Sequence, residues 1–146
     1  MEVIKFAEAT EQASYTASPI PTTETDAIVV KGADVDPSSV ISVGNNTQGT
    51  LYINFTKGSL TNCTIKLYGS PYGNPADDQW FTETEESSSS GALTLNPISI
   101  VLTDDTTKKM WHFPLGANRA YKITVKGNGT ANTGSSISLV LSLRSN

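Results

Sequence analysis

The sequence predicts an all-β protein: an antiparallel β-sandwich, jelly-roll or immunoglobulin-like, with an extended N-terminal arm. Three observations support this fold class. Apolar and polar residues alternate with a period of two in many short segments, and turn residues separate these segments at intervals of about ten residues. In addition, almost no segment has the period of an amphipathic helix. The composition does not distinguish the two topologies.

The chain has the size of one domain. Its 146 residues are enough to form a hydrophobic core without disulfide bonds. Only 16% of the residues are charged, against roughly 25% in an average domain, whereas Ser, Thr and Asn are abundant. We therefore expect a surface made mainly of hydroxyl and amide groups, which suits hydrated interfaces with other proteins.

Residues 1–25 are expected to form an arm that leads into a sandwich domain at residues 26–146. Pro19 and Pro21 favour extended backbone and exclude a helix there. Such an arm can add a strand to the sheet edge of a neighbouring protein. We therefore predict that a partner contacts the apolar residues of the arm, namely Val3, Ile4, Phe6, Pro19 and Ile20.

The expected strands of the domain follow one another in quick succession. Each is a short run of alternating or β-branched residues bounded by turn residues. They lie at residues 27–32, 40–44, 50–56, 63–69, 79–85, 92–96, 97–105, 109–115, 119–126 and 137–144. We expect a long surface loop at residues 70–79 and a flexible turn at residues 86–91, the run ESSSSG. In and beside the long loop, Tyr72, Asn74 and Trp80 are predicted to contact a partner.

Two pairs of these strands have the pattern of antiparallel hairpins. The terminal pair covers residues 119–126 and 137–144, which a turn rich in Gly and Asn connects. The other pair covers residues 50–56 and 63–69. In each strand the apolar residues fall on one face, as expected for a sheet with one buried side.

The residues that usually carry chemistry are few and dispersed. Cys63 is the only cysteine and His112 the only histidine, so neither a disulfide bond within the chain nor a Cys2His2 zinc site can form. Cys63 lies on the apolar face of its strand, where we expect a buried, unreactive thiol. Catalytic triads and phosphate-binding glycine loops are absent from the sequence.

Neighbouring acidic residues are interpreted as ordinary turn residues, because Asp hydrogen-bonds its own backbone in turns. None has the spacing of a calcium loop, and nothing selects two of them as a glycosidase pair. The pairs are Asp34 and Asp36, Asp77 and Asp78, Glu85 and Glu86, and Asp104 and Asp105. We therefore expect a protein that is not an enzyme, with no cofactor and no metal.

Charge and hydropathy argue against two classes of partner. The formal net charge is −4, and the few basic residues are spread along the chain instead of forming the positive stripe that nucleic acid requires. No apolar run approaches the length of about eighteen residues that spans a bilayer. The first residues also lack the basic start and the apolar segment of a secretory signal. We expect no nucleic acid, no membrane, and assembly in a cytoplasm.

Several aromatic residues near the expected loops leave an alternative open. Exposed aromatic rings hold sugars in many sandwich modules by stacking. The other interpretation is that the two tryptophans anchor the core or a subunit interface. The residues concerned are Tyr68, Tyr72, Trp80, Phe81 and Trp111.

The second half of the chain, from Trp80 to Arg144, resembles small virion structural proteins of tailed bacteriophages. The resemblance rests on a strand followed by FPLGANRAYKITVKG, a turn of Gly, Asn and Thr, and SSISLVLSLR, preceded by WFTETEESSSSGALTLNPISIVL. It brings no catalytic residues with it.

This resemblance implies a non-enzymatic virion protein that assembles in the bacterial cytoplasm. The expected role is a capsid decoration or cement subunit, a homo-oligomer that binds the major capsid protein and stabilises the head. A tail or head-to-tail component and a carbohydrate-binding β-sandwich module, with a glycan as partner, are the alternatives.

Overall fold

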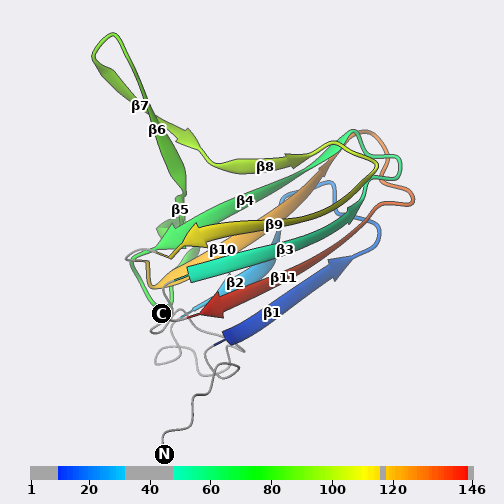
Figure 1. Ribbon diagram of the computed structural model, residues 1–146, viewed down its shortest axis with the longest axis horizontal. Helices are drawn as coiled ribbons and strands as arrows, with labels where there is room; N and C mark the ends of the chain where they lie inside the picture. Colours follow the sequence, from blue (N-terminus) through cyan, green and yellow to red (C-terminus); the bar gives the residue numbers. More distant parts are fainter. Residues whose placement is uncertain (1–9, 32–47, 116–117, 145–146) are drawn as a thin grey trace, which may run out of the picture.

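The computed structural model describes residues 10–31, 48–115 and 118–144, and within them the chain is almost entirely β-strand (Figure 1). The predicted all-β sandwich is confirmed. The described elements are β1 (Thr10–Ala17), β2 (Thr25–Val30), β3 (Gln48–Thr56), β4 (Asn62–Ser70), the short 3-10 helix η2 (Asp77–Gln79), β5 (Phe81–Thr82), β6 (Thr84–Ser89), β7 (Ala92–Pro97), β8 (Ser99–Leu102), β9 (Thr106–Pro114), β10 (Ala120–Asn128) and β11 (Ser136–Arg144). The expected strand at 40–44 lies outside the described residues.

The strands form two packed sheets with the topology of a jelly roll. One sheet has the order β1-β11-β3-β9, and the other has the order β2-β10-β4 with β5 and β8 both paired to β4. The antiparallel pairs β1–β11, β2–β10, β3–β9 and β4–β8 are those of a long ribbon folded back on itself. Successive pairs of this ribbon lie in alternate sheets, which is the jelly-roll arrangement that the composition left open.

The structure corrects both predicted hairpins. β3 and β4 lie in different sheets, and so do β10 and β11. The loops between them cross from one sheet to the other and bond to each other, because the amide of Ser59 donates to the carbonyl of Thr133 at 2.9 Å. Gly58 allows this approach: its φ is +57°, and a Cβ there would lie 2.5 Å from the backbone of Gly134.

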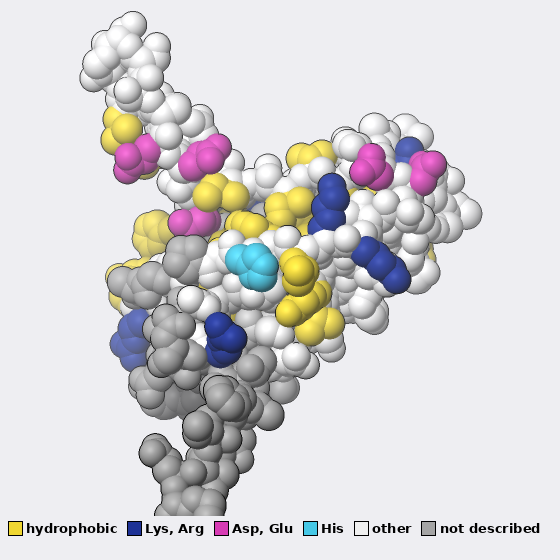
Figure 2. Space-filling model, in the orientation of Figure 1, with side chains coloured by type: hydrophobic (Ala, Val, Ile, Leu, Met, Phe, Trp, Pro, Cys, Tyr) yellow, Lys and Arg dark blue, Asp and Glu magenta, His cyan; other side chains and the backbone are white. Residues whose placement is uncertain are grey.

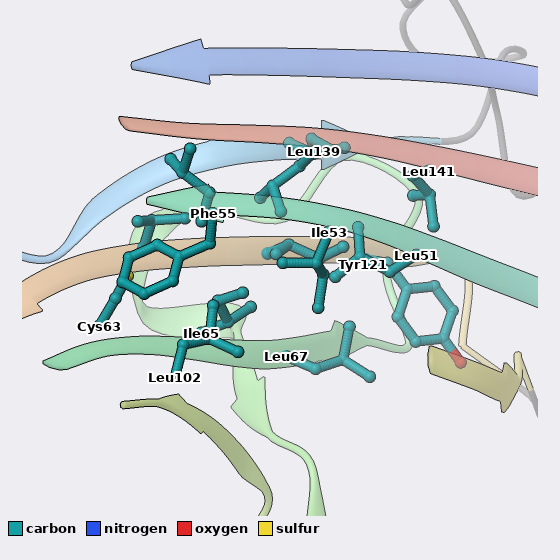
Figure 3. Close-up of a cluster of buried hydrophobic side chains, with 14 of the residues drawn as sticks. Leu51, Ile53, Phe55, Cys63, Ile65, Leu67, Leu102, Tyr121, Leu139 and Leu141 are labelled. Atoms are coloured by element: carbon teal, nitrogen blue, oxygen red, sulfur yellow. The ribbon is translucent and has the colours of Figure 1, made fainter. Parts of the chain in front are cut away.

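The core lies between the two sheets and is built from the alternating residues that the sequence predicted to face inward (Figure 3). In β3 and β11 the inward residues are fully buried, while their neighbours along the strand face solvent or lie at the surface. The largest fully buried side chains include Phe55, Leu51, Ile65, Ile123, Leu139, Leu141 and Leu143. Burial of such side chains is the main source of the stability of the fold.

Residues 10–25, which the sequence analysis assigned to an arm, are part of the sandwich. β1 pairs with β11 along its whole length, from Thr10 opposite Arg144 to Ala17 opposite Ile137. Ile20 has no exposed surface, and its amide donates to the Ser135 hydroxyl at 3.0 Å. The described sandwich thus begins at Thr10, because β1 pairs with β11 and Ile20 fills part of the core.

Residues 86–89 lie in a strand, whereas the sequence predicted a flexible turn at residues 86–91. β6 pairs with β7 from Thr84 opposite Pro97 to Ser89 opposite Ala92. Ser90 and Gly91, with φ values of +53° and +77°, close the hairpin in two residues. This β6–β7 hairpin is an insertion in the ribbon between β5 and β8, and it projects away from the sandwich (Figure 1).

We expect Leu139→Ala to lower the free energy of unfolding by about 2–5 kcal/mol, because it leaves a cavity in a fully buried site. Ser138→Ala, one residue earlier on the outer face of the same strand, should change it by less than about 0.5 kcal/mol. Urea unfolding followed by circular dichroism measures both. Equal effects at the two positions would contradict the assignment of the inner face.

Candidate interaction surfaces

The only thiol of the chain is buried, as predicted. Cys63 lies on the inner face of β4 with no exposed surface. Burial raises the pKa of the thiol to about 11, although a hydrogen bond from the backbone of Lys126 opposes part of this rise. A thiol with such a pKa is protonated at neutral pH and is a poor nucleophile.

Among the described residues, the other groups that the sequence singled out for chemistry are not gathered into a site, and Asp34 and Asp36 lie outside the described residues. His112 is exposed on β9, and its Nδ1 lies 2.9 Å from the Thr50 hydroxyl. Asp105 forms an ion pair with Lys57, at 3.5 Å between Oδ1 and Nζ. Within the described ranges, no three residues of the types His, Cys, Asp and Glu come close enough to hold a metal ion. In the same ranges, no helix is long and apolar enough to cross a membrane.

The residues predicted to contact a partner have different positions in the structure. Tyr72 and Asn74 are exposed in the loop before η2, and Pro19 is exposed in the connection from β1 to β2. Trp80 is only half-buried. Ile20, by contrast, belongs to the core of this domain, and its side chain is not accessible to a partner. Val3, Ile4 and Phe6 lie outside the described residues.

The outer face of the β2-β10-β4 sheet carries a hydrogen-bonded carboxylate. The Oε1 atom of Glu24 accepts hydrogen bonds from the Tyr68 hydroxyl at 2.6 Å and from the Thr124 hydroxyl at 2.7 Å. These two bonds lower the pKa of Glu24. Burial, together with the bond to Glu24, raises the pKa of Tyr68 to about 12. The network holds the segment before β2 against β4 and β10.

The rings of Tyr68 and Trp80 make cation–π contacts with Lys122. The Lys122 Nζ atom lies 5.0 Å from the ring centroid of Trp80 and 5.2 Å from that of Tyr68. It also lies 3.6 Å from Oδ1 of Asp26. A sugar that stacked on these ring faces would have to displace Lys122 and its cation–π contacts. Trp111 is half-buried and packs on Phe113, with ring centroids 4.8 Å apart.

The outer face of the other sheet carries a shallow apolar groove of about 370 Å³ between β9, β3 and β11. Tyr52 on β3 stands opposite Met110 on β9 and opposite Val140 on β11, so the three side chains form a row across the sheet. Tyr52 is 43% exposed and Met110 59% exposed. Lys108 lines one end of the groove. Figure 2 shows this hydrophobic patch beside the single histidine, with lysines close by. We call it the β3–β9 groove.

The β6–β7 hairpin presents a second exposed apolar surface. Leu93 is 63% exposed and Leu95 59% exposed. Both side chains project from the same face of β7, because they are two residues apart in the strand. Glu86 stands directly opposite Leu95 on β6, and acidic side chains are visible along the base of the hairpin in Figure 2.

The two edges of the β1-β11-β3-β9 sheet differ in chemistry. β9 carries Lys108 and Lys109 and ends at Pro114, which are residues that discourage the addition of another strand. From Gln12 to Ala17, β1 has neither a charge nor a proline. β1 pairs only with β11 among the described residues, so within this part of the chain no strand pairs with its other edge, which we call the open edge of β1.

Neither the groove nor the hairpin was predicted from the sequence. One signal for the hairpin was present: the residues before the alternating Leu93 and Leu95 are almost all Ser and Glu. A strand whose neighbour has no apolar face cannot cover its own leucines. The groove combines residues of three strands, which no local pattern reveals.

No protein-family model matches the chain, and no curated protein sequence matches it. Among solved structures, the SPBc2 prophage-derived protein YomS is similar, with 16% sequence identity over 98% of this chain and 99% of that chain and a TM-score of 0.48. PirA is similar with 13% identity over 98% of this chain and 100% of that chain and a TM-score of 0.39.

We expect Tyr68→Phe to raise the pKa of Glu24 towards 4.5, because it removes the strongest hydrogen bond to the carboxylate. Thr124→Val should raise it by less. A carbon-13 NMR titration of the Glu24 carboxyl group measures the pKa in each variant. An unchanged value in Tyr68→Phe would contradict the role of the hydroxyl.

The pKa shifts of Glu24 and Tyr68 determine how the stability of the fold changes with pH. The pKa of Glu24 is lower in the folded chain than in the unfolded chain, so its contribution to stability is complete above pH 4.5 and is lost as the pH falls through the folded value. The pKa of Tyr68 is raised from 10.0 to about 12, so its contribution is present below pH 10 and is lost as the pH rises towards 12.

Proposed function

We propose that the chain is a non-enzymatic virion structural protein, a capsid decoration subunit that binds the major capsid protein of a bacteriophage and stabilises the head. The proposal combines two independent lines of support. The sequence from Trp80 to Arg144 resembles small virion structural proteins, and the described surface offers open sheet edges and apolar patches instead of a cluster of reactive groups.

The observation that carries the proposal is the open edge of β1. Its outward side chains, Gln12, Ser14 and Thr16, are small or neutral and exposed, while Ala13 and Tyr15 pack towards the core. From Gln12 to Ala17 the strand has no charged side chain, and no other described strand pairs with this edge, so it is a template for strand addition from another protein. The opposite edge, on β9, carries Lys108 and Lys109, so the contrast between the two edges supports strand addition at β1.

In this proposal, a strand of the major capsid protein pairs with β1, and the exposed loop residues Tyr72 and Asn74 extend the contact. Backbone pairing supplies affinity, and the outward side chains of β1 supply specificity. Many symmetry-related copies on one shell then add modest contacts into a large total. A tail or head-to-tail position would use the same edge on a different partner.

Particles produced by the genome that encodes this chain provide the test. We expect the chain in purified particles, with antibody labelling over the head, and we expect Ser14→Lys to lower its occupancy at least about tenfold. Thr130→Lys adds the same charge on an exposed loop and should leave occupancy unchanged.

Two outcomes separate the alternatives. Labelling confined to the tail would move the protein to a tail role while keeping the proposal of a virion protein. Absence of the chain from purified particles, with the chain folded and abundant in the infected cell, would overturn the proposal.

A further inference from the structure

We propose that copies of this chain associate head to tail, with the β6–β7 hairpin of one copy docked in the β3–β9 groove of the next. This inference rests on the proposed function as a virion subunit, because it defines how neighbouring copies contact each other. It uses surfaces other than the edge of β1.

No other described strand packs against the leucine face of the hairpin. β6 and β7 pair only with each other among the described strands, and they leave Leu93 and Leu95 in solvent. A two-stranded hairpin is marginally stable in water and becomes stable when its apolar face packs on another surface. The hairpin projects away from the sandwich (Figure 1), so the groove of the same copy cannot provide that surface.

The β3–β9 groove has the size and chemistry that the hairpin needs. Its volume of about 370 Å³ is lined by the exposed Tyr52 and Met110 and the partly exposed Val140, so two leucine side chains would meet an apolar surface there. Met110 has a flexible side chain that adapts to the shape of a partner. The groove and the hairpin are on different parts of the molecule, so both are available in every copy.

Opposite charges beside the hairpin leucines and beside the groove favour one orientation of the docked hairpin. Glu86 shares the face of the hairpin that carries Leu95, and Lys108 lines the groove beside Met110. Neither side chain has an ion-pair partner within the described part of the chain. A copy docked with its leucines over Met110 brings Glu86 of one copy towards Lys108 of the next. A groove of this charge would bind the acidic hairpin more readily than it would bind a basic segment.

A contact between two different patches of the same protein is heterologous. Such contacts close into a ring when the rotation between copies allows it, and otherwise form a filament. A hairpin with two leucines presents less surface than a standard interface, so a single contact forms only at high protein concentration, and a closed ring or a capsid surface strengthens it.

Mixing two defective variants tests the inference. Leu95→Glu disables the hairpin and keeps the groove, whereas Met110→Glu disables the groove and keeps the hairpin. We expect wild-type protein to show a mass that rises with concentration in sedimentation velocity, and each variant alone to associate about 10- to 100-fold more weakly. The two variants mixed should form a one-to-one heterodimer that does not grow, because one intact hairpin meets one intact groove.

The charge pair provides a second set of variants that leaves the apolar residues in place. Glu86→Lys alone and Lys108→Glu alone should each weaken association, and both changes in one chain should restore it. Thr94→Ala, on the opposite face of the hairpin from Leu93, is the matched control and should associate like wild type.

Two results would overturn the inference. Wild-type protein that stays monomeric at every concentration would exclude self-association through this contact, and failure of the mixed variants to form a heterodimer would exclude the head-to-tail geometry. Neither result touches the proposed function, which is judged by the presence of the chain in particles. If wild-type protein is monomeric but the Leu95→Glu variant is absent from purified particles, the hairpin binds the capsid protein and not a second copy.

Discussion

Mutual burial of two apolar sheet faces is the constraint on which the rest of this structure depends. Each long strand has one apolar face, and the folded ribbon places β1, β11, β3 and β9 opposite β2, β10 and β4 so that these faces cover each other. The loops that cross between the sheets are held together by backbone hydrogen bonds near Gly58. Only the β6–β7 hairpin lies outside this arrangement, and it is the part of the described chain with leucines left in water.

The sequence predicted which residues face inward but not which strands pair. Leu139 and Ile123 alternate with polar residues in the same way whether their strands form a hairpin or lie in opposite sheets, because the period of two depends only on burial of one face. The pairing is decided by loops that cross the sandwich and by contacts distant in sequence. Ile20 illustrates the same limit, because it is buried beside a segment distant in sequence, and its amide bonds to Ser135, which is 115 residues away.

The candidate surfaces were harder to predict than the fold. Trp80 was singled out because it is aromatic and next to a loop, yet its ring is engaged by Lys122 of a different strand. The exposed apolar residues that the structure brings together, Tyr52 and Met110, are unremarkable in the sequence, since Tyr52 stands between the inward-facing Leu51 and Ile53, and Met110 follows two lysines. An exposed patch is a property of three strands side by side, so only the arrangement of the sheet reveals it.

These surfaces divide the molecule into parts with separate roles. In the proposals made above, the edge of β1 meets the capsid, and the hairpin and the β3–β9 groove join neighbouring copies. The face with Glu24, Tyr68 and Lys122 holds its own loop and strand segments together. A scaffold stabilised by its core can present such surfaces without moving them.

Amide hydrogen exchange of the β6–β7 hairpin at low and high protein concentration tests the central claim, that a neighbouring copy covers this hairpin, most directly. The account predicts that exchange from Thr84 to Pro97 slows at least about tenfold as concentration rises, while the amides of β4 and β10 remain equally protected at both concentrations. Rapid exchange of the hairpin that does not change with concentration would contradict it.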